Sequence, residues 1–172
     1  MPQEPLPESS PVNILVDLLL RFPEIYTITL NLPSATCSLT YMVRRKLGRG
    51  EHPGLERRIR ESLKTFFYLN RYRYKAKEQI KLSRKQYHDL TQLSIVLSYD
   101  FLLGDTISLL TALMRDLFQD DLITEDRTGS GTRRPVRELI EESAPVPEAL
   151  ARCRSSRLVA FRDAGKVYIF DK

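Results

Sequence analysis

The sequence has few of the residues that catalytic and metal sites usually need. It contains two histidines and two cysteines, at positions 52, 88, 37 and 153, and no pair of them has a spacing typical of a zinc or redox site. The neighbours His88 and Asp89 are better explained as a polar turn than as an acid–base pair, because adjacent residues of an extended chain point apart. We therefore expect a non-catalytic protein without metal or cofactor, although a site assembled from distant loops would leave no signal of this kind.

Long apolar runs and targeting signals are also lacking. The apolar run 12–22 has 11 residues, whereas a helix that crosses a bilayer needs about 20. The first ten residues, MPQEPLPESS, contain no basic segment of a secretory signal. Two cysteines in a chain of 172 residues are typical of reduced thiols inside a cell. We therefore expect a cytoplasmic protein that does not interact with a membrane.

No glycine-rich loop has the pattern of a phosphate-binding loop. The segment 48–54 places its glycines as G-x-G-x-x-x-G, between an expected strand and an expected helix. It lacks the Lys-Ser/Thr pair of nucleotide-binding loops, and Glu51 adds a carboxylate that would repel phosphate. We interpret this segment as an ordinary connection.

Positive charge is concentrated in one part of the chain. The whole sequence has 27 Lys and Arg against 22 Asp and Glu, a net charge of +5. Residues 44–85 alone hold 15 basic and four acidic side chains, which leaves this segment at +11 and the remainder at −6. Such asymmetry within one small protein indicates a surface for a polyanion.

The segment 71–85, RYRYKAKEQIKLSRK, alternates basic and mostly apolar side chains. In a strand, alternate side chains point to opposite faces, so one face would be cationic with charges about 6.7 Å apart. Together with basic residues of a neighbouring strand and helix, this face predicts a module that binds RNA or a ribonucleoprotein. The expected nucleic-acid-binding residues are Arg44, Lys46, Arg57, Arg60, Lys64, Arg71, Arg73, Lys75, Lys77, Lys81 and Lys85.

An alternative interpretation of the same pattern is an edge strand whose lysines and arginines prevent pairing with other chains. The alternation also argues against base stacking, because Tyr72 and Tyr74 point away from the cationic face and leave only Met42 and Val96 as sizeable apolar groups there. No ribonucleoprotein-type aromatic motif occurs. Any binding is therefore expected to depend on shape and charge.

The hydrophobic pattern predicts an α+β fold with a strand–strand–helix order that occurs twice. We expect a two-layer structure in which a four-stranded, mainly antiparallel sheet has its helices on one face. The expected elements are a helix over 11–22, strands over 24–32 and 37–46, a helix over 55–70, the basic strand, a strand over 91–99 and a helix from 105 to about 118.

Alternation and helical spacing also predict which side chains are buried. In the strand 24–32 the even residues, Tyr26 among them, are expected inward and Ile25 outward. In the strands 37–46 and 91–99 the odd residues are expected inward. The helix 55–70 is expected to bury Leu55, Ile59, Leu63 and Phe66.

The chain is expected to divide into a disordered tail (1–10), an α+β domain (11–120), a flexible linker (121–134) and a C-terminal part with short helices and a hairpin (135–172). The hairpin, 157–171, is apolar on both faces, and an isolated hairpin is marginal in water. The helix 11–22 is apolar over most of its circumference and must be covered on two sides. We therefore expect the hairpin to dock on this helix, within one chain or between two copies.

Docking between chains would make the protein an interaction or assembly factor. This is the alternative to nucleic-acid binding, and it implies a homodimer or another protein partner. The residues expected at that interface are Leu15, Leu19, Phe161, Tyr168 and Phe170.

Overall fold

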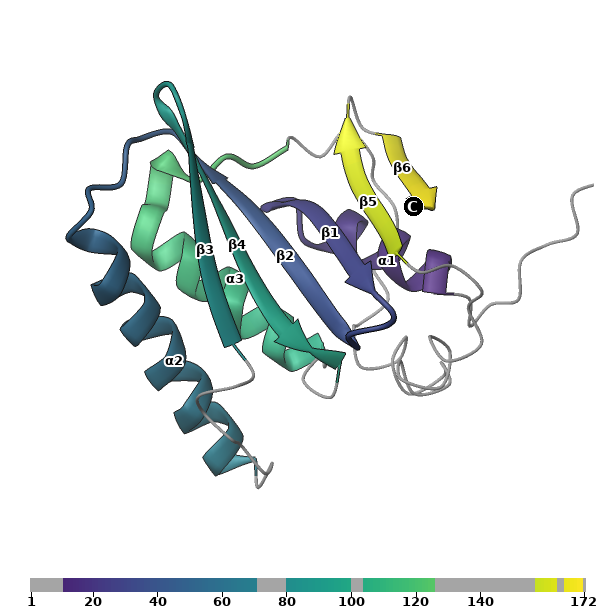
Figure 1. The fold of residues 1–172 in the computed structure, drawn as a ribbon, viewed down its shortest axis with the longest axis horizontal. Coiled ribbons are helices and arrows are strands. Elements are labelled where there is room, and N and C mark those ends of the chain that lie inside the picture. Colours follow the sequence, from purple (N-terminus) through teal and green to yellow (C-terminus); the bar gives the residue numbers. More distant parts are fainter. Residues whose placement is uncertain (1–10, 71–79, 100–103, 126–156, 164–165, 172) are drawn as a thin grey trace, which may run out of the picture.

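The computed structural model describes residues 11–70, 80–99, 104–125, 157–163 and 166–171. Its helices are α1 (Pro11–Arg21), α2 (Glu51–Leu69) and α3 (Gly104–Phe118), with the short 3-10 helix η2 (Gln119–Asp121) after α3. Its strands are β1 (Ile25–Asn31), β2 (Thr36–Val43), β3 (Ile80–Tyr87), β4 (Leu90–Ser98), β5 (Arg157–Asp163) and β6 (Lys166–Asp171). The strands form one antiparallel sheet in the order β3-β4-β2-β1-β5-β6. In Figure 1, α1 and α3 lie behind this sheet and α2 lies beside its β3 edge.

The α+β class is confirmed, but the sheet has six strands where we expected four. The two additional strands are the C-terminal hairpin, whose β5 pairs with β1 from Thr27–Phe161 to Asn31–Arg157. This pairing satisfies backbone N–H and C=O groups along an edge of β1 that the four-stranded arrangement would leave open. The hairpin is therefore part of the main sheet and not an appendage beside it.

The strand β1 contains an irregularity that reverses part of its expected pattern. Ile25 pairs with Tyr41 and Thr27 with Thr40, so Tyr26 is an extra residue at a bulge. Ile25 is consequently buried, whereas Tyr26 is 50% exposed. The prediction that placed Tyr26 inside and Ile25 outside was wrong, because simple alternation does not allow for two residues opposite one.

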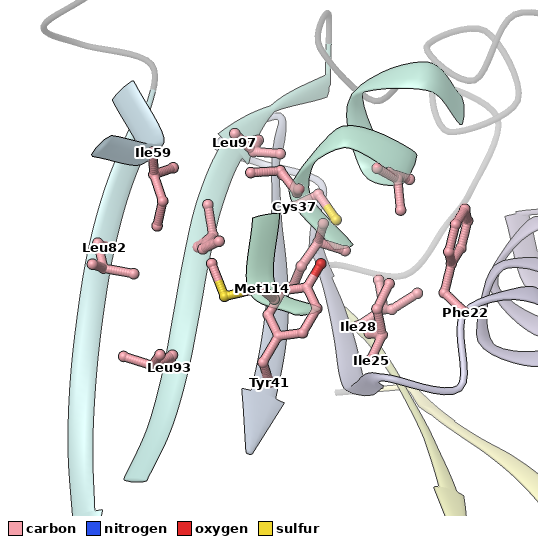
Figure 2. Packing of buried hydrophobic residues seen from close by; sticks show 14 of the residues in the cluster. Phe22, Ile25, Ile28, Cys37, Tyr41, Ile59, Leu82, Leu93, Leu97 and Met114 are labelled. Atoms are coloured by element: carbon pink, nitrogen blue, oxygen red, sulfur yellow. The ribbon is translucent and has the colours of Figure 1, made fainter. Parts of the chain in front are cut away.

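One continuous core lies between the sheet and the helices (Figure 2). The odd residues of β2 and β4 face it, as expected from their alternation. The ring of Tyr41 is fully buried, and its hydroxyl hydrogen-bonds the Thr111 hydroxyl of α3 at 3.1 Å. A buried phenol requires such a partner, so this bond ties the centre of the sheet to α3.

The helix α2 begins four residues before the expected position. Glu51 is its first residue, and the Glu51 carboxylate accepts a hydrogen bond from the Gly48 backbone N–H at 2.6 Å. Pro53 fits here because the first turn of a helix does not need its missing N–H. The last buried residue of the helix is Phe67, four positions after Leu63, and the expected Phe66 is only half-buried.

The helix α1 is covered by its own chain. Leu15 and Leu19 are 1% and 0% exposed and belong to the same core cluster as Leu158 and Ala160 of β5. The prediction that Leu15 and Leu19 face a partner was therefore wrong, because the hairpin of the same chain packs on α1. The helix ends at Arg21, before Pro23, as expected.

Several expectations concern segments outside the described residues. They are the tail 1–10, the first half of the basic segment (71–79), most of the linker and the short C-terminal helices. Within the part of the chain that the structure describes, no helix is both long and apolar enough to span a membrane.

Candidate nucleic-acid interface

The sheet has one face turned away from the three helices, which we call the open face. Strand pairing aligns its side chains in rows that run from β3 to β6 across all six strands. The central row is Ser83, Ser94, Thr40, Thr27, Phe161 and Tyr168, and the next row is Lys81, Val96, Ser38, Thr29, Val159 and Phe170. Each row therefore starts at a polar or cationic residue and ends at an aromatic ring.

The cationic end of the open face is formed by β3. Lys81, Ser83 and Lys85 are exposed on it, whereas Ile80 and Leu82 are buried on the helix side. The alternation expected for the basic segment is thus confirmed for its described half. The two lysines are four positions apart in the strand, which places their backbone positions about 13 Å apart.

Arg84 lies on the other side of β3 and has a structural role. Its guanidinium donates hydrogen bonds to the backbone carbonyls of Leu47 and Gly48, the latter at 2.9 Å. These bonds fix the connection between β2 and α2 against the edge of the sheet. Arg84 is therefore not available to a ligand on the open face.

The basic residues of α2 lie on a helix outside the sheet. Arg57 and Lys64 are exposed on this helix, which lies beside the β3 edge of the sheet in Figure 1. Arg60 is turned between α2 and β3, where its guanidinium contacts the Glu56 carboxylate at 2.6 Å and the Ile80 carbonyl oxygen at 3.2 Å. Arg60 thus connects α2 to the β3 edge of the sheet, and the expectation that the basic residues of strand and helix form one surface stays a prediction.

The remaining expected residues lie at or beyond the ends of the strands. Arg44 and Lys46 follow β2 and are exposed, and the Lys46 ammonium is 3.6 Å from the Asp89 carboxylate, an exposed pair that contributes little. The expected residues Arg71, Arg73, Lys75 and Lys77 lie outside the described residues. Of the eleven expected residues, the structure places Lys81 and Lys85 on the open face.

Hydroxyl and amide groups occupy the middle of the open face. The Thr40 and Ser94 hydroxyls are hydrogen-bonded to each other at 3.0 Å across β2 and β4. The Gln92 side-chain amide approaches the Ser94 hydroxyl at 3.5 Å, and the Ser83 hydroxyl approaches the Ser94 carbonyl oxygen at the same distance. Such groups can donate to phosphate and sugar oxygens.

Three aromatic rings lie at the other end of the open face. Phe161 of β5 stacks on Tyr168 with 5.4 Å between ring centroids and 20° between planes, and on Phe170 with 5.6 Å and 8°. Tyr168 is 40% exposed and Phe170 is 49% exposed. We call Phe161, Tyr168 and Phe170 the aromatic row.

The sequence-based expectation that no aromatic side chain shares the cationic face was wrong. It considered Tyr72 and Tyr74, neighbours in the same segment, whereas the aromatic row comes from a hairpin about 80 residues later in the chain. The available signal was the second apolar face of that hairpin. Sequence alone did not show that this hairpin joins the same sheet.

Charged side chains also meet on the helix side of the hairpin. The Glu24 carboxylate, which is buried, forms an ion pair with Arg115 of α3, and Arg162 of β5 lies 3.1 Å from the Glu125 carboxylate. Burial lowers the pKa of Arg162, while the Glu125 and Glu24 carboxylates oppose this shift. The Arg162–Glu125 pair links β5 to the segment after α3 and so holds the hairpin in place, whereas the Glu24–Arg115 pair links the start of β1 to α3.

Within the described ranges, no group of three or more His, Cys, Asp or Glu side chains is placed to hold a metal ion. Comparison with protein families, with curated proteins and with solved structures finds no match to this chain. A functional interpretation therefore depends on the geometry of the open face itself.

Proposed function

We propose that this protein is a non-catalytic module that binds nucleic acid, RNA in particular, on the open face of its sheet. The observation that carries the proposal is the position of Lys81 and Lys85 on one face of β3, the face that the helices leave uncovered. Among the described residues, neither lysine forms an ion pair with a carboxylate of this chain. The Lys85 ammonium lies 5.0 Å from the ring centroid of Tyr87 on the same strand, and this contact leaves its N–H groups able to donate to phosphate.

The rest of the face suits the same ligand. Phosphate contacts supply most of the affinity of such modules, and polar groups beside them fix the position of the sugar–phosphate backbone. The Ser83 hydroxyl lies between the two lysines on β3, the Ser94 hydroxyl is on the neighbouring strand β4, and the Thr40 hydroxyl is one strand further, on β2. The net charge of +11 over residues 44–85 adds attraction at longer range.

The test compares two charge-matched double variants. Lys81→Gln with Lys85→Gln removes two charges from the open face, and Arg57→Gln with Lys64→Gln removes two exposed charges from α2, outside the sheet. Fluorescence anisotropy with a labelled RNA measures affinity between about 50 and 200 mM salt. Each lost phosphate contact lowers the slope of log K against log salt by about 0.7 for a single strand, so the first variant should lose about 1.4.

The second variant should keep the wild-type slope, because its two positions do not contact the ligand. A wild-type protein without salt-dependent RNA binding would refute the proposal. Equal slopes in the two variants would also refute it, since the effect would then follow net charge and not position on the open face.

The second candidate function, protein assembly, now depends on the hairpin alone. Leu15 and Leu19 are covered within the chain, but Tyr168 and Phe170 are exposed on β6, which is at the end of the six-stranded sheet. An exposed edge strand can pair with a second copy or another partner. Light scattering over a range of protein concentrations tests this candidate, and a constant monomer mass argues against self-association.

A further inference from the structure

We propose that the open face binds single-stranded nucleic acid, with phosphates at Lys81 and Lys85 and bases stacked on the aromatic row. The strand of nucleic acid would cross the sheet from β3 to β6. This inference rests on the proposed function, and it names the class of nucleic acid and a second contact region. It assigns a ligand to Phe161, Tyr168 and Phe170.

The first argument is the register of the sheet. Lys81 and Phe170 are the two ends of one row, and Ser83 and Tyr168 are the two ends of the next. Five spacings between neighbouring strands separate β3 from β6, a distance of about 24 Å. This distance is too long for one nucleotide and fits a segment of several nucleotides that contacts both ends of the open face.

The second argument is the arrangement of the rings. The planes of Phe161 and Phe170 differ by 8° and those of Phe161 and Tyr168 by 20°, so the three rings form a nearly parallel series. Tyr168 and Phe170 keep 40% and 49% of their surface exposed, and a base can extend the series at either ring. Bases of a duplex are already stacked within the helix, so this contact selects unpaired bases.

The third argument is that the aromatic row is not required to dock the hairpin. The opposite face of the hairpin, with Leu158 and Ala160 buried and Val167 and Ile169 partly buried, packs against the core. The ion pair between Arg162 and Glu125 lies on that side as well. Among the residues that the structure describes, the contacts of the hairpin with the core therefore leave its aromatic face open to a ligand.

The test uses the double variant Tyr168→Leu with Phe170→Leu, which keeps apolar bulk and removes the flat ring faces. The control is Tyr68→Leu, an exposed tyrosine on α2, outside the sheet. The probes are an unstructured RNA of about ten nucleotides, the same strand with abasic residues, and an RNA duplex. Circular dichroism and thermal unfolding establish that each variant is folded.

Loss of one stacked base should weaken binding of the single strand at least 5-fold, and loss of two about 30-fold. The double variant should bind the abasic strand and the duplex as the wild type does, because those contacts involve phosphates only. Wild-type protein should itself prefer the intact strand over the abasic strand. The control variant should retain wild-type affinity for all three probes.

The outcomes separate this inference from the function on which it rests. If wild-type protein binds none of the probes, both proposals fail. If binding depends on Lys81 and Lys85 but the leucine variant keeps its affinity for the single strand, this inference alone is overturned. A leucine variant that changes the molar mass in light scattering without changing RNA affinity would also overturn it, and would assign the aromatic row to a protein partner.

Discussion

Replacement of Leu19 by alanine tests whether α1 is covered by its own chain and not by a partner. Leu19 is 0% exposed, in the core cluster that also contains Leu158 and Ala160 of the hairpin strand β5. Its neighbour Leu20 is 55% exposed on the same helix. The variants Leu19→Ala and Leu20→Ala are thus chemically identical changes at one covered and one open position.

The expected cost at Leu19 follows from the atoms that are removed. Leucine to alanine deletes three carbons, worth about 0.8 kcal/mol each when buried, or about 2.4 kcal/mol in total. The cavity that remains adds roughly 1 kcal/mol, so the free energy of unfolding should fall by about 3 kcal/mol. Leu20→Ala removes the same atoms from a half-solvated position and should cost at most about 1 kcal/mol.

Urea unfolding followed by circular dichroism measures both changes. With a slope of about 2 kcal/mol per molar urea, Leu19→Ala should lower the midpoint by about 1.5 M, and Leu20→Ala by less than about 0.5 M. The midpoint of each protein should not depend on protein concentration, because α1 is covered within one chain. Equal losses in the two variants, or a midpoint that rises with protein concentration, would refute the intrachain packing of α1.

Two further predictions concern titratable groups. Hydrogen bonds from the Arg45 guanidinium and the Gly48 N–H lower the pKa of Glu51 below its ordinary value of 4.5. A lowered carboxyl pKa stabilises the fold above the unfolded value, so the difference in melting temperature between wild type and Glu51→Gln should be constant near neutral pH and shrink as pH falls below about 4. A difference in melting temperature that grows as the pH falls would contradict the lowered pKa of Glu51. Burial raises the pKa of the Cys37 thiol, so in a Cys153→Ser background an aromatic disulfide reagent at pH 8 should label Cys37 only after unfolding. Rapid labelling of the native protein would show that Cys37 is accessible.

The hydrophobic pattern of the sequence was sufficient to predict which side chains face the core wherever this depends on a single strand. The odd residues of β2 and β4 face the core as their alternation predicts, because a regular strand sends alternate side chains to opposite faces. Lys81 and Lys85 are exposed on one side of β3 for the same reason. The start of α2 and the bulge at Tyr26 were missed, since both depend on contacts that periodicity does not describe.

The candidate site was only half predictable. Its lysines were found because they alternate within one segment of the sequence. Its aromatic row was not found, because Phe161, Tyr168 and Phe170 reach the same face only through the pairing of β5 with β1. The basic residues of α2 come from the helix beside β3, and a charge count does not specify the layer in which a helix packs.

The sequence by itself determined the α+β class, the two-faced hairpin and the alternating charge of β3, because these follow from the spacing of apolar and charged residues within each segment. Only the tertiary structure decided that the hairpin extends the main sheet beside β1 and covers Leu15 and Leu19 of α1. The apolar hairpin could have docked on its own chain or on another copy of the protein, and the local sequence pattern does not distinguish these two arrangements. Backbone hydrogen bonding along β1 and burial of α1 select the intrachain arrangement, and that choice brings the lysines and the aromatic row onto one surface.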